Sequence, residues 1–347
     1  MKKKEIVLWL TDPHLDKDNG ALVKDIFRQA IKICKDRRIW NMVCGGDVFT
    51  NRSGQPLETL TDFIEITEMI KEAGLVLDVI PGNHDKTDAN SNKSYLDLYN
   101  DGDQIRVHQE LASQMIEGVW FHFIPHFKDD RWLSEYSDFN KEVLKTDYVN
   151  ILVTHTGFEG VKNNDGSEVE SEIKPSMFKD FDLVLVGHYH NSSMLAKNIL
   201  YTGSAYQNNF GETITNKGFC IINNDATLRF IPSKFPRYIR EDVDVNDTET
   251  IRNLVEKYDG NKSDHIRFVF HGKDADRHKV NIGELSKLGF DAKYESTEQT
   301  EAIEVSESES VLTFDKKTML RDFLKFAAEN EIKGKQLVYG MNLIKTI

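Results

Sequence analysis

The sequence has little cysteine, no long apolar run and fewer basic than acidic residues. Its cysteines, Cys34, Cys44 and Cys220, are too few and too scattered for a disulfide framework or a thiolate metal site, so we interpret them as small buried side chains. No apolar run reaches the roughly 18 residues of a membrane-spanning helix, and the opening MKKKEIVLWL becomes polar too soon for a secretory signal. We therefore expect a cytoplasmic protein without a membrane partner.

The charge balance is acidic, with 57 Asp and Glu against 44 Lys and Arg and a formal net charge of -13. This balance argues against a nucleic-acid partner, because contacts to phosphates normally need clustered Lys and Arg. It does not exclude one. Bound divalent cations can supply a local positive field, and a partner subunit can supply the rest.

Apolar runs alternate with amphipathic helical patterns in the first eighty residues. EIVLWL, NMVC and LVLDVI are separated by helix-like periodicity over 21–37 and 57–73, which predicts a βαβαβ unit with a mostly parallel sheet. The apolar stripe of the second helix is expected to contain Leu60, Phe63, Ile64 and Ile70. Later apolar runs follow one another too closely for helices between most of them, which favours antiparallel pairing and two sheets packed as a sandwich.

The chain is longer than one typical domain, and its pattern changes near residue 235. We expect an α/β (α+β) sandwich domain over 1–234, a small α/β module over 235–296, an acidic linker over 297–314 and a helical segment over 315–347. The linker has the composition of a solvated segment. The last segment carries an apolar stripe, which fits packing within the chain and docking on a partner equally well. The stripe includes Leu320, Phe323 and Leu324.

Polar side chains with metal-binding chemistry come directly after five of the apolar runs. In an extended chain, residues i and i+2 point to the same side, so Asp12 and His14 can present a carboxylate and an imidazole together. The carboxyl ends of strands in an α/β sheet form one crevice, so distant residues converge there. The candidates are Asp12, His14, Asp47, Asn83, His84, His155, His188 and His190. Glycines precede several of them, and glycine lets the backbone turn sharply and approach an ion.

Leaving His84 aside, the set offers seven oxygen and nitrogen ligands and no thiolate. Imidazoles with carboxylates suit Mn, Fe or Zn better than Mg or Ca. Seven ligands are too many for one ion, but if Asp47 bridges, two sites of four ligands result. Two ions about 3.5–4 Å apart are the usual arrangement for in-line displacement at phosphorus. Each motif alone also fits a capped turn, a tight turn or surface histidines, but five of them at strand ends favour a common site.

The order DPH, GD, GNHD, H and GHYH resembles the calcineurin-like metallophosphoesterase superfamily, over residues 5–232. Within it, LTDPHLD, GGDVFT, IPGNHD, VGHYH and YTGSAYQNNFGETITNKGF are similar to SbcD-type DNA-repair nucleases. The resemblance implies a metallophosphoesterase β-sandwich flanked by helices, a capping domain over 235–296 and a C-terminal helical tail.

The resemblance also implies roles for single residues. The first ion would be held by Asp12, His14, Asp47 and His190, and the second by Asp47, Asn83, His155 and His188. His84 would be the catalytic residue that contacts the scissile phosphate and assists departure of the 3′ oxygen. Asp85 would either orient His84 or cap the next turn. The ions would be Mn²⁺, with Mg²⁺, Fe²⁺ and Zn²⁺ as alternatives.

The function implied is that of a two-metal DNA nuclease, exonuclease or endonuclease, in DNA repair and recombination. Its partners would be DNA, a second copy in a homodimer and an SbcC-type coiled-coil ATPase that contacts the stripe at 320–324. Some family members carry His or Asp three residues after the bridging Asp. Here that residue is Thr50, which leaves the balance of exonuclease and endonuclease activity open.

Two further functions remain as alternatives. One is a different dinuclear metallophosphoesterase acting on phosphoproteins or small phosphoesters, although GDVFTNR lacks the GDxVDRG string of phosphoprotein phosphatases. The other is a non-catalytic scaffold of the same fold, which the full set of seven ligands and His84 disfavours. His126 could reach the substrate, but a histidine at the end of a buried strand is the simpler interpretation.

Overall fold

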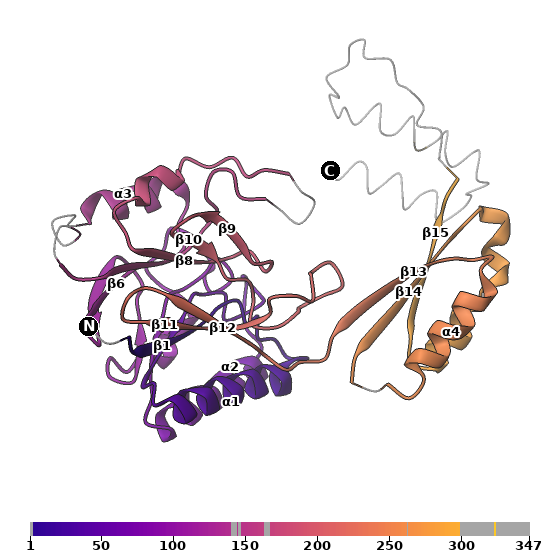
Figure 1. Ribbon diagram of the computed structural model, residues 1–347, viewed down its shortest axis with the longest axis horizontal. Helices are drawn as coiled ribbons and strands as arrows, with labels where there is room; N and C mark the ends of the chain where they lie inside the picture. The colour runs from indigo at the N-terminus through magenta and orange to yellow at the C-terminus, as the bar shows by residue number, and fades with distance from the viewer. Residues whose placement is uncertain are drawn as a thin grey trace, which may run out of the picture. The chain divides into compact units, whose positions relative to one another are not determined.

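Two sheets packed face to face form the centre of the first compact unit, Met1–Thr297 (Figure 1). The structure is a computed structural model that describes residues 3–139, 144, 147–162, 167–261, 263–298 and 323. Within these residues, the first sheet has the strand order β12-β11-β1-β2-β3-β4 and the second has the order β5-β6-β7-β8-β10-β9. The predicted sandwich is confirmed.

The first sheet consists of β1 (Glu5–Leu10), β2 (Asn41–Cys44), β3 (Val76–Val79), β4 (Ile105–Val107), β11 (Gly218–Asn223) and β12 (Leu228–Pro232). The second consists of β5 (Ala112–Ile116), β6 (Val119–Ile124), β7 (Asn150–His155), β8 (Leu183–Gly187), β9 (Ser193–Ala196) and β10 (Ile199–Tyr201). The helices are α1 (Gly20–Arg37), α2 (Leu57–Glu72) and α3 (Asp129–Asp138), with short 3₁₀ helices η1 (Tyr95–Tyr99) and η3 (Pro175–Phe178).

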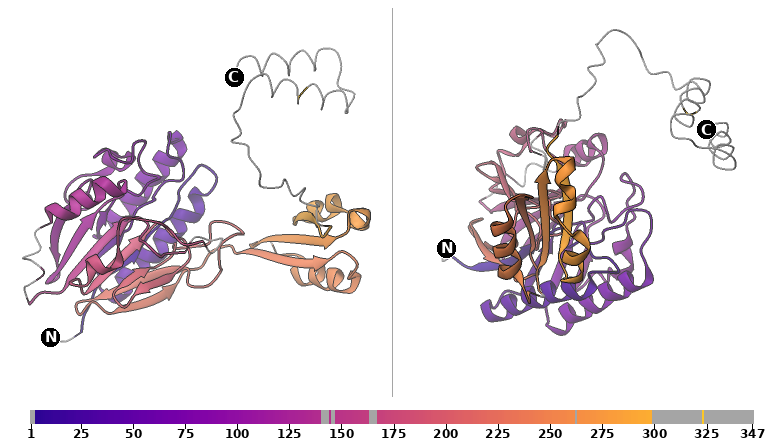
Figure 2. Two further views of the ribbon diagram at one scale, coloured as in Figure 1. Left: turned by 90° about the horizontal axis from the view of Figure 1, so that it is seen from above. Right: turned by 90° about the vertical axis from the view of Figure 1, so that its right-hand side faces the viewer.

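Helices cover the outer face of each sheet (Figures 1 and 2). Phe27 of α1 and Phe63 of α2 belong to the core under the first sheet, and Trp132 of α3 belongs to the core under the second. A third core, which includes Trp9 and Phe123, lies between the sheets. Burial on both faces explains why the central strands are almost continuously apolar.

The strand directions agree with the sequence prediction in the first sheet and differ in the second. β1, β2, β3 and β4 are parallel, as predicted. However, β6, β7, β8 and β10 are also parallel, so the antiparallel pairing expected in the second half of the chain does not extend to them. The reason is that the connections at 125–149 and 156–182 are long enough to cross back over the sheet, and they contain α3 and η3. Antiparallel pairing is confined in the described chain to β5, β9, β11 and β12 with their neighbours.

The apolar face of α2 differs from the prediction at one residue. Phe63 and Ile70 are fully buried, but Ile64 is 50% exposed and Ile66 is buried in its place. Because an α-helix has 3.6 residues per turn, positions 63, 66 and 70 share a face and position 64 lies well off it.

Helices and strands are present after residue 235, where the sequence predicts a small α/β module. They are β13 (Tyr238–Asp244), α4 (Thr248–Tyr258), β14 (His265–Gly272), η4 (Asp274–Lys279), α5 (Ile282–Lys287) and β15 (Asp291–Ser296). The strands form a parallel sheet with a separate core that includes Phe268 and Phe290. A domain boundary near residue 235 stays a proposal.

The C-terminal expectations concern residues that the structure leaves almost entirely undescribed. Of the acidic linker, only 297 and 298 are described, and of the helical segment only Phe323, which is helical and half-buried. Leu320 and Leu324 lie outside the described residues. Among the helices that are described, none combines the length and the apolar character needed to cross a membrane.

The corrected face of α2 gives a test by mutation. Phe63 is 1% exposed and packs edge-to-face against Tyr99, with ring centroids 4.7 Å apart. We expect Phe63→Ala to lower the free energy of unfolding by about 3–5 kcal/mol, because it leaves a cavity in the core. Ile64→Ala should cost less than about 1 kcal/mol, since the side chain is half-exposed. Denaturant unfolding of both variants checks this, and equal losses would contradict the assigned face.

Candidate metal centre

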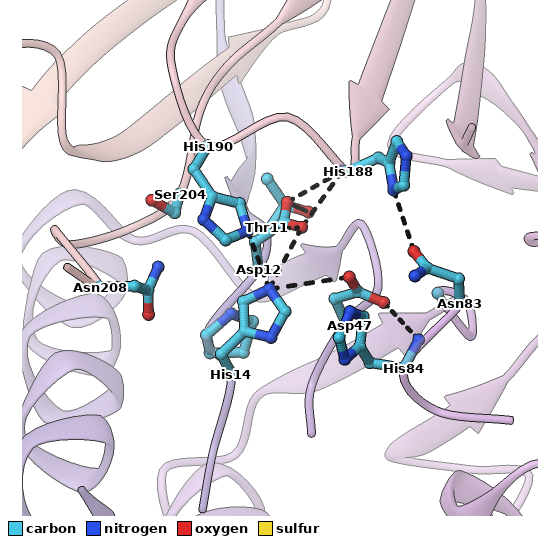
Figure 3. A network of polar contacts seen from close by, with 12 residues as sticks. Thr11, Asp12, His14, Asp47, Asn83, His84, His188, His190, Ser204 and Asn208 are labelled. Atoms are coloured by element: carbon cyan, nitrogen blue, oxygen red, sulfur yellow. Dashed lines mark hydrogen bonds and ion pairs between the residues drawn. The ribbon is translucent and has the colours of Figure 1, made fainter. Parts of the chain in front are cut away.

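Every site residue predicted from the sequence lies at or just after the carboxyl end of a strand, and both sheets contribute (Figure 3). β1 is followed by Asp12 and His14, β2 by Asp47, β3 by Asn83 and His84, and β8 by His188 and His190, while His155 ends β7. A pocket of about 370 Å³ opens over this edge. The structure therefore brings all eight residues together.

The first group of ligand atoms consists of Asp12, His14 and His190. Nε2 of His14 and Nε2 of His190 are 2.9 Å apart, and they lie 3.9 Å and 3.8 Å from Oδ1 of Asp12. In the second group, His155 Nε2 lies 3.3 Å from Asp47 Oδ1.

Asn83 and Asp47 complete the arrangement. Oδ1 of Asn83 lies 3.1 Å from His155 Nε2 and 2.9 Å from His188 Nδ1. The second carboxylate oxygen of Asp47, Oδ2, lies 3.6 Å from His14 Nε2 in the first group. Asp47 thus presents one oxygen to each group, as a bridging ligand must, and Figure 3 shows it between them.

The hydrogen bonds of the imidazoles show that a cation fits among these atoms. In His155, Nδ1–H donates to the backbone oxygen of Gly45, so Nε2 is the ring nitrogen that faces the oxygens of Asn83 and Asp47. In His190, Nδ1–H donates to Glu212, so its Nε2 lone pair faces His14. Lone pairs that face each other repel unless a proton or a metal ion lies between them. A divalent ion in each group would accept all the lone pairs of that group at once.

Burial and neighbouring charges set the protonation of the histidines and of Asp47 in the two groups. It lowers the pKa of His14 to about 4 and that of His188 to about 3, so both are neutral at pH 7 and keep a lone pair for a metal. Burial would also lower the pKa of His155, but the Asp47 carboxylate outweighs it and raises the pKa to about 9. In the same way, burial opposes ionisation of Asp47, yet His155 holds its pKa well below the usual range.

The backbone is strained at four of these residues. Asp12, His14, Asp47 and His188 have φ values of 54°, 44°, 49° and 92°, in the left-handed region that non-glycine residues seldom occupy. Such strain persists only where the surrounding structure imposes it, and it is concentrated at functional sites. Gly82 allows the strand ends to approach, because a methyl group there would overlap the Asp47 carboxylate.

His84 faces the pocket but belongs to neither group of ligands. Its backbone N–H donates to Asp47 Oδ1 (2.8 Å), its Nδ1–H donates to the backbone oxygen of Thr50, and its Nε2 lies 3.3 Å from Nη2 of Arg52. The carboxylate of Asp85 instead accepts from the backbone N–H groups of Gly82 and Phe49. These bonds fix the backbone at Gly82 and Phe49, which is neither of the two roles expected for Asp85, and His84 is oriented instead by the carbonyl group of Thr50.

Sequence reasoning missed three residues around the pocket. Arg52 and Asn208 line it, and Glu212 bonds His190 from behind. The last two lie in YTGSAYQNNFGETITNKGF, where nothing distinguishes a polar side chain that contacts the site from one exposed to solvent. His126, in contrast, bonds the backbone oxygen of His155 at the end of a strand, as its simpler interpretation predicted.

The profile of the calcineurin-like phosphoesterase family matches residues 7–192. The chain belongs to this family. Its members are hydrolases of phosphoesters with a dinuclear metal site, and the two groups of ligands in this chain agree with that chemistry. Which metal they hold, and which phosphoester is cleaved, belongs to the proposal below.

Curated relatives are similar over most of the chain. Putative phosphoesterase 244L of Invertebrate iridescent virus 6 is 22% identical over 77% of this chain and 93% of its own length. The SbcD component of the SbcCD nuclease of Staphylococcus saprophyticus is 25% identical over 69% of each chain. Exonuclease subunit 1 of Enterobacteria phage T4 is 26% identical over 60% of each chain. Two of these three family relatives are thus named as parts of nucleases.

The position of Asp47 between the two groups generates a prediction. We expect Asp47→Ala to release both ions together, because each group loses an oxygen ligand and the shared charge. His188→Ala should release only the second ion, since the imidazole of His188 belongs to that group and its backbone N–H bonds to Asp12 remain in the variant. Metal content after gel filtration, measured by mass spectrometry, checks both variants. One ion retained at full occupancy in Asp47→Ala would contradict the bridge.

Proposed function

We propose that this chain is a two-metal DNA nuclease that hydrolyses phosphodiester bonds as an exonuclease or endonuclease. The observation that carries the proposal is the pairing of two ligand groups, joined by Asp47, with one additional imidazole, His84, that faces the same open pocket. The names of the curated relatives favour a nuclease over other phosphoesterases. Asp12 would bind the first ion and Asp47 would bind both, and Mn²⁺ suits their mixed imidazole and carboxylate surroundings best.

When bound, the two ions would neutralise the charge of the phosphate and activate water for in-line attack. His84 would act on the opposite side of the phosphorus. Its Nδ1–H is held by the carbonyl group of Thr50, so Nε2 is the atom that exchanges a proton with the leaving 3′ oxygen. Thr50 takes the place where some relatives carry His or Asp, so His84 is the proton donor in this proposal.

Two hydrogen-bond donors at the pocket would contact substrate phosphates. Arg52 is the single Lys or Arg among the described residues that line the pocket, so it would bind a phosphate by charge. The buried Nδ2 of Asn208 has no acceptor among the described protein atoms, and it lies at the same pocket. The positive charge of Arg52 offsets, locally, the acidic balance of the chain.

The partners follow from the resemblance to SbcD-type nucleases. We propose that the chain acts on DNA as a homodimer and with an SbcC-type coiled-coil ATPase. The stripe of Leu320, Phe323 and Leu324 would contact that ATPase.

Replacing His84 tests the proposed chemistry. The proposal predicts that the purified chain cleaves linear DNA in Mn²⁺, and more slowly in Mg²⁺. His84→Ala should keep both ions, because His84 is no ligand, but should lose at least about a hundredfold in rate, as general acid–base catalysis is worth that much. Metal content and single-turnover cleavage are measured on the same preparation.

Two outcomes would contradict this proposal. Loss of metal from His84→Ala would show that its role is wrongly assigned. Hydrolysis of a generic phosphomonoester but of no DNA, with or without a candidate ATPase, would favour a small-phosphoester hydrolase instead.

Replacing Arg52 tests the proposed phosphate contact. We expect Arg52→Ala to raise KM for DNA, and to reduce the slope of log affinity against log salt concentration by about one, because one phosphate contact releases about one counterion. Arg229→Ala serves as the matched control, since this exposed arginine lies on β12 and does not line the pocket. DNA binding of both variants in the presence of Ca²⁺ is measured over a salt series. An unchanged slope in Arg52→Ala would remove Arg52 from the substrate site.

A further inference from the structure

His190 is held differently from the other histidines of the metal centre. Its Nδ1–H donates to the carboxylate of Glu212, with 2.7 Å between Nδ1 and Oε1. The corresponding bond of His155 goes to a neutral backbone oxygen, that of Gly45. Within the described hydrogen bonds and ion pairs, His190 is the site histidine whose outer ring nitrogen contacts a carboxylate.

Glu212 is itself fixed by a buried network. Its side chain is fully buried, and Lys217, whose side chain is 1% exposed, donates to Oε2 at 2.6 Å. The backbone N–H of Asn208 donates to the same oxygen at 3.1 Å, and Nδ2 of Asn209 donates to Oε1 at 3.2 Å. The carboxylate therefore has a defined position, and its buried charge is paired.

Lys217 also fixes the backbone of His190. Its ammonium group donates to the backbone oxygen of His190 at 2.7 Å and to Oγ of Ser204 at 2.7 Å, in addition to Glu212. The backbone N–H of Ser204 donates to the same oxygen of His190 at 3.1 Å. All three N–H groups of the lysine are thus used. The ring and the main chain of His190 are held from the same loop.

A carboxylate at the outer nitrogen of an imidazole has three effects on the inner nitrogen. It fixes the proton on Nδ1, so that Nε2 carries a lone pair; it limits rotation of the ring; and it makes Nε2 a stronger donor to a metal. Here Nε2 is the atom that faces Asp12 and His14. The network thus acts on the first group of ligands.

We propose that Glu212, held in place by Lys217, is a positioning residue that presets His190 as a ligand of the first metal ion. The proposal rests on the metal-binding role of His190 and not on DNA as the substrate. The competing interpretation of the same contacts is that the buried ion pair stabilises the loop between β10 and β11, and that metal binding is independent of it. The two interpretations predict different behaviour of the first ion.

The experiment is titration of the metal-free protein with Mn²⁺ by calorimetry. We expect Glu212→Ala to weaken the first ion 10- to 100-fold, the usual effect of losing such an outer partner, and to leave the second ion within about twofold. Glu212→Gln keeps an acceptor for Nδ1–H without the charge, so its loss should be smaller. Thr213→Ala is the matched control, because Thr213 is the exposed neighbour of Glu212 and bonds Asn191. It should bind both ions like the unchanged protein.

A second measurement is independent of metal. In the metal-free protein, ¹⁵N chemical shifts of the His190 ring should report a proton on Nδ1, and Glu212→Ala should shift the ring to a mixture of tautomers. If Glu212→Ala fails to fold, Glu212→Gln carries both measurements.

The proposal would be overturned if the folded Glu212 variants bound both ions as tightly as the wild-type protein and kept the same His190 tautomer. Glu212 would then have only a loop-stabilising role. A wild-type chain that binds both ions but cleaves no DNA would contradict the proposed function and not this inference.

Discussion

The metal centre depends on one electrostatic constraint: buried imidazole nitrogens and carboxylate oxygens converge at hydrogen-bonding distance, and a proton or a metal ion must lie between them to relieve their repulsion. Two imidazole nitrogens face each other at 2.9 Å, and a third faces the oxygens of Asn83 and Asp47. Such a cluster is unfavourable in a low dielectric medium unless positive charge fills it. Most other features of this edge of the fold serve to hold these atoms in place.

The sandwich supplies the geometry for this convergence. Each sheet has a run of parallel strands, so the carboxyl ends of β1, β2 and β3 meet those of β7 and β8 at one edge. The turns after these strands adopt left-handed backbone at Asp12, His14, Asp47 and His188. The cores on either side of the sheets offset this strain. Their buried apolar surface contributes far more stabilisation than a few strained residues cost.

The loop between β10 and β11 contacts both the first metal group and the α/β module after residue 235. On one side, Glu212 and Lys217 hold His190. On the other, the side chain of Gln207 donates to the backbone oxygens of Glu212 (2.9 Å) and Tyr238 (3.0 Å), and it accepts from the backbone N–H of Tyr238. Since Tyr238 begins β13, Gln207 connects the first metal group to the α/β module, and Phe210 of the same loop adds a ring contact to Tyr238.

The sequence by itself determined the sandwich class of the fold and the identity of the polar residues at the strand ends. Apolar runs followed by Asp, Asn and His are a local pattern that can be read from the sequence. Because parallel strands end at the same edge of a sheet, this pattern predicts that the polar residues lie together at that edge. The ligand assignments and the role of His84 remain proposals, but their spatial grouping was foreseeable. Local patterns also indicated a small α/β module after residue 235.

Tertiary structure alone decided the rest. The directions of β6, β7, β8 and β10 depend on where their connections cross, and the exposure of Ile64 depends on which face of α2 the sheet covers. The side chains of Glu212 and Lys217 acquire their partners only when a loop folds against a strand end distant in sequence. Periodicity reports which side of an element is apolar, but a polar residue in a loop has no periodicity. Its contacts are therefore fixed only by the packing of the whole chain.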